Sequence, residues 1–342
     1  MKALILEGIT SLKENPQPLK QVEVPVPVVG SEEILVQVSA CGVCHTELDE
    51  IEGRTPPPRF PVILGHQIVG KVVERGKKAR KFKPGAHVGV GWIYSSCGEC
   101  SFCRSGIENL CADFKATGRD ADGGYAEYLK INQDYAFLIP ENFTSSQAAP
   151  LLCAGAIGYR SLRLANLTDG QRLGLTGFGA SAHLVLKLFQ YLYPHSQIFV
   201  FARSERERNF ALELGAAWAG DTDDESPHKL HSIIDTTPVW KPVVEALKNL
   251  ESAGRLVVNA IRKEETDKEY FQKLDYARHL WQEKEIKSVA NVTRRDITEF
   301  LELAIKIPLI PEVTEYPLRE ANRALMELKE GKIRGAKVLK IS

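Results

Sequence analysis

Four cysteines lie within fifteen residues, at positions 97, 100, 103 and 111, and they constrain the fold of this chain more than any other feature. Four thiolates complete a zinc tetrahedron and leave no corner for a substrate, so Cys97, Cys100, Cys103 and Cys111 predict a structural zinc site. Unligated thiols are a poor alternative, because few apolar neighbours could bury them. An iron–sulfur run needs a shorter last gap and a following proline, whereas Ala112 follows the fourth cysteine.

Two of the remaining three cysteines indicate a second metal site with a different character. Cys44 opens the run Cys-His-Thr-Glu-Leu-Asp, His66 lies in a Gly-His-Gln turn, and Cys153 lies far along the chain in Leu-Cys-Ala-Gly. Each of them alone could be an ordinary core residue. Together, two thiolates and one imidazole fill three corners of a zinc tetrahedron and leave the fourth open, which is typical of a catalytic zinc.

Charge and cysteine usage limit the class of protein. The chain has 44 basic and 44 acidic residues, so its formal net charge gives no support to nucleic acid or an anionic membrane as a partner. The apolar run at the N-terminus is too short for a signal peptide, and no stretch has the length of a membrane span. An odd number of cysteines, seven, argues against a disulfide framework. We therefore expect a cytoplasmic protein that acts on a small molecule.

The pattern of predicted secondary structure changes twice along the 342 residues. The length of the chain also favours two domains. Residues 1–154 read as short strands separated by proline and glycine. Residues 155–293 alternate strand and helix, which predicts a doubly wound parallel sheet of the Rossmann type. Residues 294–342 return to the first pattern. We predict an α/β fold with a β-rich catalytic zinc-binding domain (1–154 and 294–342) and a dinucleotide-binding domain (155–293). Predicted helices include 205–214, 243–250, 296–305 and 318–330, and residues 308–317 are expected to be extended.

A glycine-rich turn indicates the nucleotide. It joins a strand at 172–176 to an apolar helical segment, and it carries Gly177, Gly179 and Ala182 at the three positions of the dinucleotide fingerprint. The next strand ends in Arg203 and Ser204, where an NAD site usually has an acidic residue. A cation and a hydroxyl suit a 2′-phosphate, so the sequence favours NADP, with NAD or dual use as the alternative.

These motifs together resemble the zinc-dependent alcohol dehydrogenases of the medium-chain dehydrogenase/reductase superfamily, in the bacterial and yeast-like branch. The resemblance covers essentially the whole chain. It implies a GroES-like fold for the β-rich domain, two zinc ions per chain, and reversible hydride transfer between an alcohol and NADP or NAD. It also implies a homo-oligomer, either a dimer or a tetramer.

The resemblance also implies residue roles. Cys44, His66 and Cys153 would hold the catalytic zinc. Thr46 would take the proton of the alcohol, and His45 would lie near the cofactor pyrophosphate.

Residues around the ligands follow the family pattern only in part. Glu47 stands where the family usually has aspartate and would orient His66. Gln67 replaces the usual glutamate after the ligand histidine and removes one negative charge. Asp49 stands where the outer histidine of the proton relay is usual. Trp92 matches an aromatic residue of the substrate pocket wall, although it could equally be an ordinary core tryptophan.

The substrate stays open at this stage. Thr55 and the three prolines at 56–58 stand where the yeast-like branch has a bulky aromatic residue, which hints at a roomier pocket. A polyol or aryl-alcohol dehydrogenase on the same scaffold is therefore an alternative. A catalytically silent zinc-binding or redox-sensing protein is a further one, but the intact Thr46 and zinc ligands speak against it.

Overall fold

The computed structural model describes residues 1–307, 309–332 and 335–341, with the side chain of residue 180 left aside. The chain forms two compact units, residues 1–156 with 292–342 and residues 157–291. The first is rich in antiparallel strands and the second contains a parallel sheet, so the predicted α/β fold class is confirmed. No helix in the described ranges is both long and apolar enough to cross a bilayer.

The first unit is organised around one long strand, β3 (Glu33–Val43), which is buried along most of its length. It lies inside a seven-stranded sheet of order β10-β6-β5-β3-β18-β17, and β9 pairs with its first half. The other strands of this sheet are β5 (Ile68–Arg75), β6 (His87–Val90), β9 (Tyr128–Asn132), β10 (Ala136–Leu138), β17 (Val313–Pro317) and β18 (Ala336–Lys340). Smaller sheets comprise β1 (Lys2–Leu6), β2 (Leu19–Glu23) and β4 (Val62–Ile63), and β7 (Ile93–Ser95) with β8 (Lys115–Ala116).

Strand register in this unit brings two distant segments together. β3 and β5 are antiparallel, and Cys41 pairs with Ile68. Because the two strands run in opposite directions, the residues after Cys41 and the residues before Ile68 lie at the same end of the strand pair. Cys44 and His66 therefore leave the sheet side by side, although they are far apart in the sequence.

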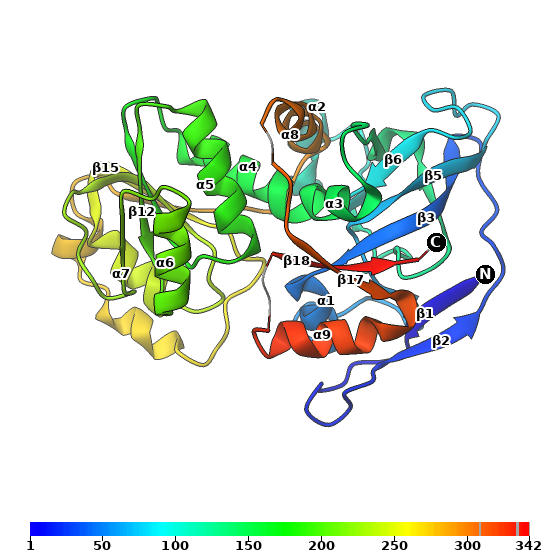
Figure 1. Cartoon of the computed structure of the whole chain (residues 1–342), viewed down its shortest axis with the longest axis horizontal. Coiled ribbons are helices and arrows are strands. Elements are labelled where there is room, and N and C mark those ends of the chain that lie inside the picture. Colours follow the sequence, from blue (N-terminus) through cyan, green and yellow to red (C-terminus); the bar gives the residue numbers. More distant parts are fainter. Residues whose placement is uncertain (308, 333–334, 342) are drawn as a thin grey trace. The chain divides into compact units, whose positions relative to one another are not determined.

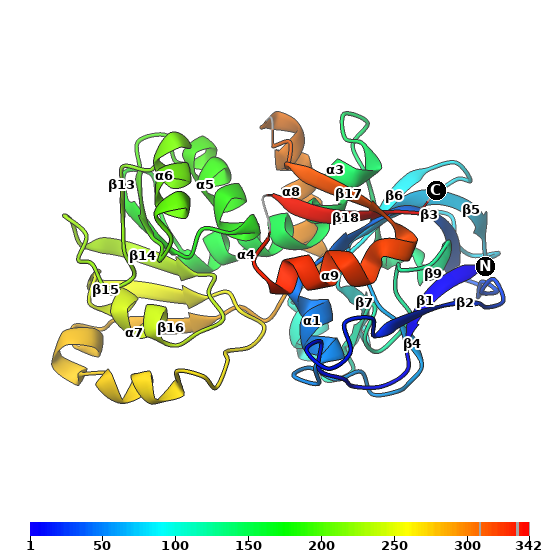
Figure 2. The same cartoon turned by 60° about the horizontal axis from the view of Figure 1, so that its bottom comes forward.

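Short helices cover the ends of these strands. α1 (His45–Ile51) follows β3 directly and contacts α9 (Ala321–Lys329); Figures 1 and 2 both show the two helices side by side. α3 (Ser145–Pro150) packs on β3 and continues into a single π-helical turn, η3 (Leu151–Gly155), which carries Cys153. The remaining helices of the unit are α2 (Ser101–Arg104), α8 (Arg294–Lys306) and the 3₁₀ turns η1 (Glu108–Leu110), η2 (Gln133–Tyr135) and η6 (Leu318–Glu320).

The second unit is a six-stranded sheet in which every neighbouring pair is parallel. Its order is β13-β12-β11-β14-β15-β16, which is the 3-2-1-4-5-6 order of the Rossmann fold. The strands are β11 (Arg172–Thr176), β12 (Gln197–Phe201), β13 (Trp218–Gly220), β14 (Leu230–Asp235), β15 (Leu250–Val258) and β16 (Glu285–Ser288). The helices are α4 (Ala156–Ala165), α5 (Ala180–Leu192), α6 (Glu205–Glu213), α7 (Lys241–Leu247), η4 (Lys268–Lys273) and η5 (Tyr276–Leu280).

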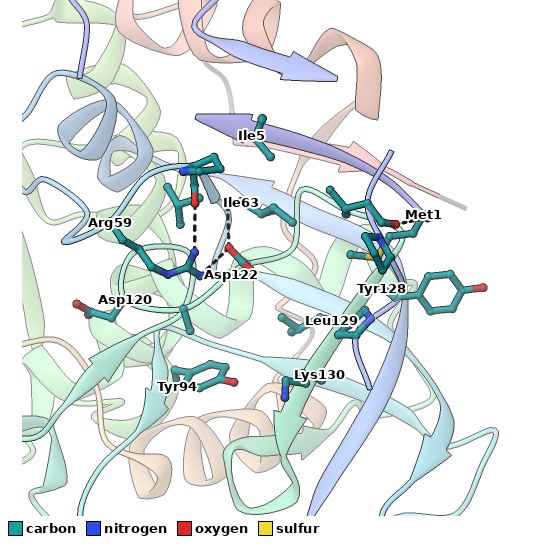
Figure 3. A pocket seen from close by; sticks show the side chains of 17 residues that line it. Met1, Ile5, Arg59, Ile63, Tyr94, Asp120, Asp122, Tyr128, Leu129 and Lys130 are labelled. Atoms are coloured by element: carbon teal, nitrogen blue, oxygen red, sulfur yellow. Dashed lines mark hydrogen bonds and ion pairs between the residues drawn. The ribbon is translucent and has the colours of Figure 1, made fainter. Parts of the chain in front are cut away.

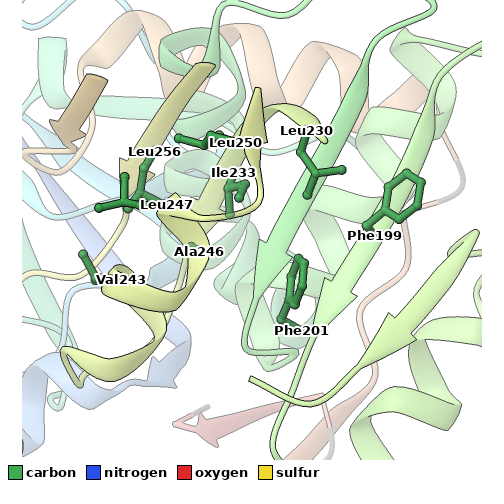
Figure 4. Close-up of a cluster of buried hydrophobic side chains, with 9 residues drawn as sticks. All are labelled: Phe199, Phe201, Leu230, Ile233, Val243, Ala246, Leu247, Leu250 and Leu256. Atoms are coloured by element: carbon green, nitrogen blue, oxygen red, sulfur yellow. The ribbon is translucent and has the colours of Figure 1, made fainter. Parts of the chain in front are cut away.

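The strand order reverses between β11 and β14, and this reversal directs the crossover helices to opposite faces. Figure 2 shows α5 and α6 on one face of the sheet and α7 on the other. Phe199 and Phe201, two residues apart on β12, point to the α7 face. Figure 4 shows them in one buried cluster with side chains from β14, β15 and α7, namely Leu230, Ile233, Val243, Ala246, Leu247, Leu250 and Leu256.

Most predicted helices lie where expected, and the differences have local causes. α6 ends next to Gly215, which adopts a φ of +93° and terminates the helix. The helix predicted at 243–250 ends at Leu247, because β15 already begins at Leu250. The helix predicted at 318–330 begins as a 3₁₀ turn after Pro317 and becomes α-helical only at Ala321. Of the segment predicted to be extended, residue 308 lies outside the described ranges.

Candidate metal centres and nucleotide-binding turn

Glu47 links two of the three predicted zinc ligands. Cys44 is the N-cap residue of α1, and its backbone N–H donates to Glu47 Oε2 at 2.8 Å. The other carboxylate oxygen, Oε1, lies 2.7 Å from Nδ1 of His66. Both side chains are almost completely buried, 1% exposed for His66 and 0% for Glu47. The carboxylate therefore fixes the imidazole so that Nε2 faces away from it.

The three predicted ligand atoms converge. The side-chain donor atoms of Cys44, His66 and Cys153 all lie within 4.8 Å of one another. Nε2 of His66 is 3.3 Å from Sγ of Cys153. A hydrogen bond with the Cys153 thiol lowers the pKa of Cys44 well below its usual value, and the thiolate is the form that binds zinc. Two sulfurs and one ring nitrogen at this spacing fit a tetrahedral zinc ion.

Thr46, His45 and Trp92 lie around this cluster in different environments. Oγ1 of Thr46 is 3.5 Å from Sγ of Cys44, and the threonine is 8% exposed. His45 begins α1 and is exposed. The Trp92 ring meets the His66 ring edge to face, with centroids 5.0 Å apart and an interplanar angle of 87°. The structure thus places Thr46 and Trp92 in contact with predicted ligands.

Gln67 and Asp49, two of the departures from the family pattern, have distinct surroundings. Gln67 is buried against the backbone of Gly42, where an added Cβ would lie 2.3 Å from Oε1 of the glutamine. Asp49 forms an ion pair with Arg54, whose backbone N–H also donates to the Asp49 carbonyl at 2.8 Å. Burial raises the pKa of Asp49, although Arg54 opposes the shift. The Arg54 partner was not anticipated from the sequence, although it lies only five residues away.

Sequence reasoning also missed Glu50, a second buried acid on α1. It lies one helical turn beyond Glu47 and is 0% exposed. Neither of its carboxylate oxygens has a hydrogen-bond partner in the part of the chain that the structure describes. Burial raises the pKa of Glu50 well above its ordinary value, which favours the neutral acid. The spacing in the sequence could have indicated that Glu50 lies on the same helical face as Glu47, since positions three apart on a helix share one face.

The four-cysteine lobe also closes on itself. The sulfur atoms of Cys97, Cys100, Cys103 and Cys111 lie within 4.8 Å of one another. Backbone N–H groups of Cys100 and Cys103 approach the sulfurs of Cys97 and Cys100 at 3.4 and 3.5 Å. The amides of Glu99 and Cys100 lower the pKa of Cys97 to about 7. Four convergent thiols with N–H groups aimed at them fit a closed zinc site.

The glycine-rich turn has the geometry of a dinucleotide fingerprint. Gly177 adopts a φ of +75°, and its N–H donates to the Phe201 carbonyl at 2.8 Å, so the turn begins between β11 and β12. Gly179 is the N-cap of α5, and a Cβ added there would meet no atom within 4 Å. Ala182 is fully buried. Open space at the second position and close packing at the third suit a pyrophosphate at the helix N-terminus.

Arg203 and Ser204 follow the end of β12. Both are exposed, and Ser204 is the N-cap of α6 without a side-chain capping hydrogen bond. Arg208 donates to the carbonyls of Ala202 and Arg203 at 2.8 and 3.0 Å and so braces this loop. The Arg203 and Ser204 side chains are accordingly accessible to a ligand beside β12.

A separate pocket of about 410 Å³ opens in the first unit. Figure 3 shows the ion pair between Arg59 and Asp122, 3.0 Å apart, at this pocket, with Tyr94 and Lys130 nearby. Its other lining residues are mostly apolar and come from β1, β4, β9 and the connecting loops. None of the predicted site residues lines it, so it is distinct from the cysteine–histidine cluster.

Comparisons with known proteins agree over nearly the whole chain. A family profile for the alcohol dehydrogenase GroES-like domain matches residues 30–141. The "Probable alcohol dehydrogenase AdhA" of Mycobacterium tuberculosis is 43% identical over 329 residues, covering 95% of this chain and 93% of that protein. A "Probable cinnamyl alcohol dehydrogenase" of Populus deltoides is 36% identical over 68% of each chain. The crystal structure of CAD from Helicobacter pylori complexed with NADP(H) superposes with a TM-score of 0.85 at 24% identity, over 99% of this chain and 97% of that one.

Proposed function

Since this chain belongs to the alcohol dehydrogenases of the medium-chain dehydrogenase/reductase superfamily, we propose that its activity depends on zinc held by Cys44, His66 and Cys153. The protein is an oxidoreductase that reversibly transfers hydride between a small alcohol and NAD(P). The convergence of the three ligand atoms within 4.8 Å of one another carries the zinc proposal. When bound, zinc supplies a Lewis acid that lowers the pKa of an alcohol hydroxyl.

The surrounding residues prepare this centre and handle the proton. Glu47 holds Nδ1 of His66 and leaves Nε2 for the metal. Thr46 takes the proton of the substrate hydroxyl, a role supported by its position 3.5 Å from the Cys44 sulfur. Asp49 receives the proton further out, where the ion pair with Arg54 holds its carboxylate in place. Trp92 forms part of the pocket wall beside His66.

The four-cysteine lobe holds a second, structural zinc in this proposal. Closed tetrahedral sites of four thiolates stabilise small segments that lack a large core. The lobe from Cys97 to Cys111 contains only two short helical turns. A metal would therefore supply much of its folding energy.

The cofactor proposal is NADP bound at the Gly177 turn. Gly177, Gly179 and Ala182 supply the pyrophosphate turn. Arg203 and Ser204 are exposed at the end of β12, where a 2′-phosphate would lie. NAD remains the alternative cofactor for the same turn.

An aryl alcohol is the second substrate candidate. The similarity to a protein named as a cinnamyl alcohol dehydrogenase favours it. The loop at 55–58, with Thr55 followed by three prolines, leaves out the bulky aromatic residue of the yeast-like branch. A wider pocket would admit a ring-bearing alcohol.

The assembly proposed is a homo-oligomer. β16 is an edge strand of the parallel sheet, and all four of its residues are exposed. Unpaired edge strands are ready to pair with another chain. A second copy would complete this edge.

A rate assay tests the proposed activity. Purified protein with zinc is given simple, polyol and aryl alcohols or aldehydes with NADP(H) and with NAD(H), and absorbance at 340 nm is followed. We expect turnover that the replacements Cys44→Ser and Cys153→Ser abolish. No absorbance change with any of these pairs, in protein that contains zinc, would favour the silent zinc-binding alternative.

A further inference from the structure

A buried polar cluster lies at the carboxyl ends of β11 and β14. Thr176 ends β11 and Asp235 ends β14, and the threonine hydroxyl donates to Asp235 Oδ1 at 2.5 Å. Asp235 is completely buried. These two strands are neighbours at the point where the strand order reverses, and ligands of doubly wound sheets bind outside the strand ends at this point.

Lys263 neutralises this carboxylate from the segment that follows β15. Its ammonium group pairs with Asp235 Oδ2 and donates to the carbonyls of Thr237 and Val239 at 2.6 and 3.0 Å. The lysine side chain is 7% exposed. An ammonium group has three donors, and all three are used inside the protein. Lys263 therefore holds the chain at 235–239 and has no donor left for a ligand.

The residues that this pair holds form one wall of the glycine-rich turn. Thr236 donates to the Thr176 carbonyl through its backbone N–H and its hydroxyl, at 3.0 and 2.9 Å. The Thr237 hydroxyl donates to Asp235 Oδ1 at 2.7 Å. A Cβ added at Gly177 would lie 2.9 Å from Thr237 Cγ2 and 3.0 Å from Thr236 Oγ1. The two threonines thus pack directly on the first glycine of the fingerprint.

We infer that Asp235 and Lys263 are positioning residues for the nucleotide cofactor. By fixing Thr236 and Thr237 against Gly177, the buried pair holds the turn so that its backbone and the start of α5 present the pyrophosphate site. This inference rests on the proposed binding of NAD(P) at this turn. Because the pyrophosphate is common to both cofactors, the pair affects NADPH and NADH equally, unlike Arg203.

The test compares nucleotide binding in matched variants of the full-length protein. Lys263→Met removes the ammonium group, and the double variant Asp235→Asn with Lys263→Met removes both charges so that no unpaired carboxylate remains buried. Lys241→Met breaks an exposed ion pair with Asp223 in the same unit, at 2.6 Å, and serves as the control. Dissociation constants for NADPH and NADH are measured by protein fluorescence, together with melting temperature and zinc content.

We expect both Lys263 variants to raise the two dissociation constants by about tenfold and by the same factor, because small displacements of a binding group are costly. Zinc content and the control should match the wild type. If the folded variants, the double variant above all, bind both nucleotides as tightly as the wild type, the pair is merely structural and the inference is wrong. A wild type that binds neither nucleotide would overturn the proposed function itself.

Discussion

Replacing Glu47 by glutamine should weaken zinc binding at the cysteine–histidine cluster. The carboxylate accepts from the Cys44 N–H at 2.8 Å and lies 2.7 Å from Nδ1 of His66. Glutamine has one carbonyl oxygen, so it can face only one of these two nitrogens and turns an NH₂ group toward the other. The change removes the carboxylate charge from both contacts and weakens the charge-assisted hydrogen bond from Cys44, which costs about 1.5–3 kcal/mol. Since 1.4 kcal/mol is a factor of ten, zinc affinity should fall by about 10- to 150-fold.

The assay is zinc competition with a chromophoric chelator, read together with far-ultraviolet circular dichroism. Glu50→Gln is the matched control, because Glu50 is as deeply buried on the same helix but contacts no predicted ligand through a hydrogen bond that the structure describes. Burial already favours the neutral acid there, so glutamine should change zinc affinity little. Equal zinc affinity in Glu47→Gln and the wild type, with the fold retained, would refute the role of Glu47.

Three further predictions concern the cofactor, acid stability and assembly. Arg203→Ala should raise the KM for NADPH far more than the KM for NADH. The control variant Arg206→Ala should change both KM values by the same factor. An equal effect of Arg203→Ala on both cofactors would rule out a 2′-phosphate contact. The pKa of Glu327 is held at about 2 by hydrogen bonds from Lys337, Tyr316 and Arg323, whereas it is about 4.3 in an unfolded chain. The ionised carboxylate therefore stabilises the fold above about pH 4.3. This stabilisation is lost as the pH falls toward about 2. The difference in melting temperature between the wild type and Glu327→Gln should accordingly be largest above pH 4.3 and shrink below it, and a constant difference would contradict the assignment. Ile286→Lys on the exposed edge strand β16 should lower the mass measured by light scattering from that of an oligomer to that of one chain, and an unchanged mass would place the interface elsewhere.

The metal and nucleotide motifs could be predicted from the sequence because each carries its chemistry in local spacing. Four cysteines in one short lobe, and two glycines between a strand and a helix, need little tertiary information. The predicted catalytic zinc site is different, because its ligands Cys44, His66 and Cys153 are far apart in the sequence. Their convergence depends on the antiparallel register of β3 and β5 and on the turn after α3. The family resemblance supplied that long-range information, and the structure places the three atoms together.

The ion pairs of buried charged side chains were harder to predict, because the fold decides which residues lie next to a buried charge. Asp235 and Lys263 are 28 residues apart and meet only because β14 and β15 are neighbours in the sheet. Glu50 stands among other acidic residues in the sequence, yet it is fully buried. Hydrophobic periodicity marks which faces are apolar, but it does not tell which acids the core encloses.

A crystal structure phased on zinc anomalous scattering tests the central claim most directly. We expect two zinc peaks per chain. One should lie about 2.3 Å from the sulfurs of Cys44 and Cys153 and about 2.0 Å from Nε2 of His66, with water or an alcohol as the fourth ligand. The other should lie among the four cysteines of the lobe. A first peak that is missing, or that is closed by a fourth protein side chain with no room for an alcohol, would contradict the account.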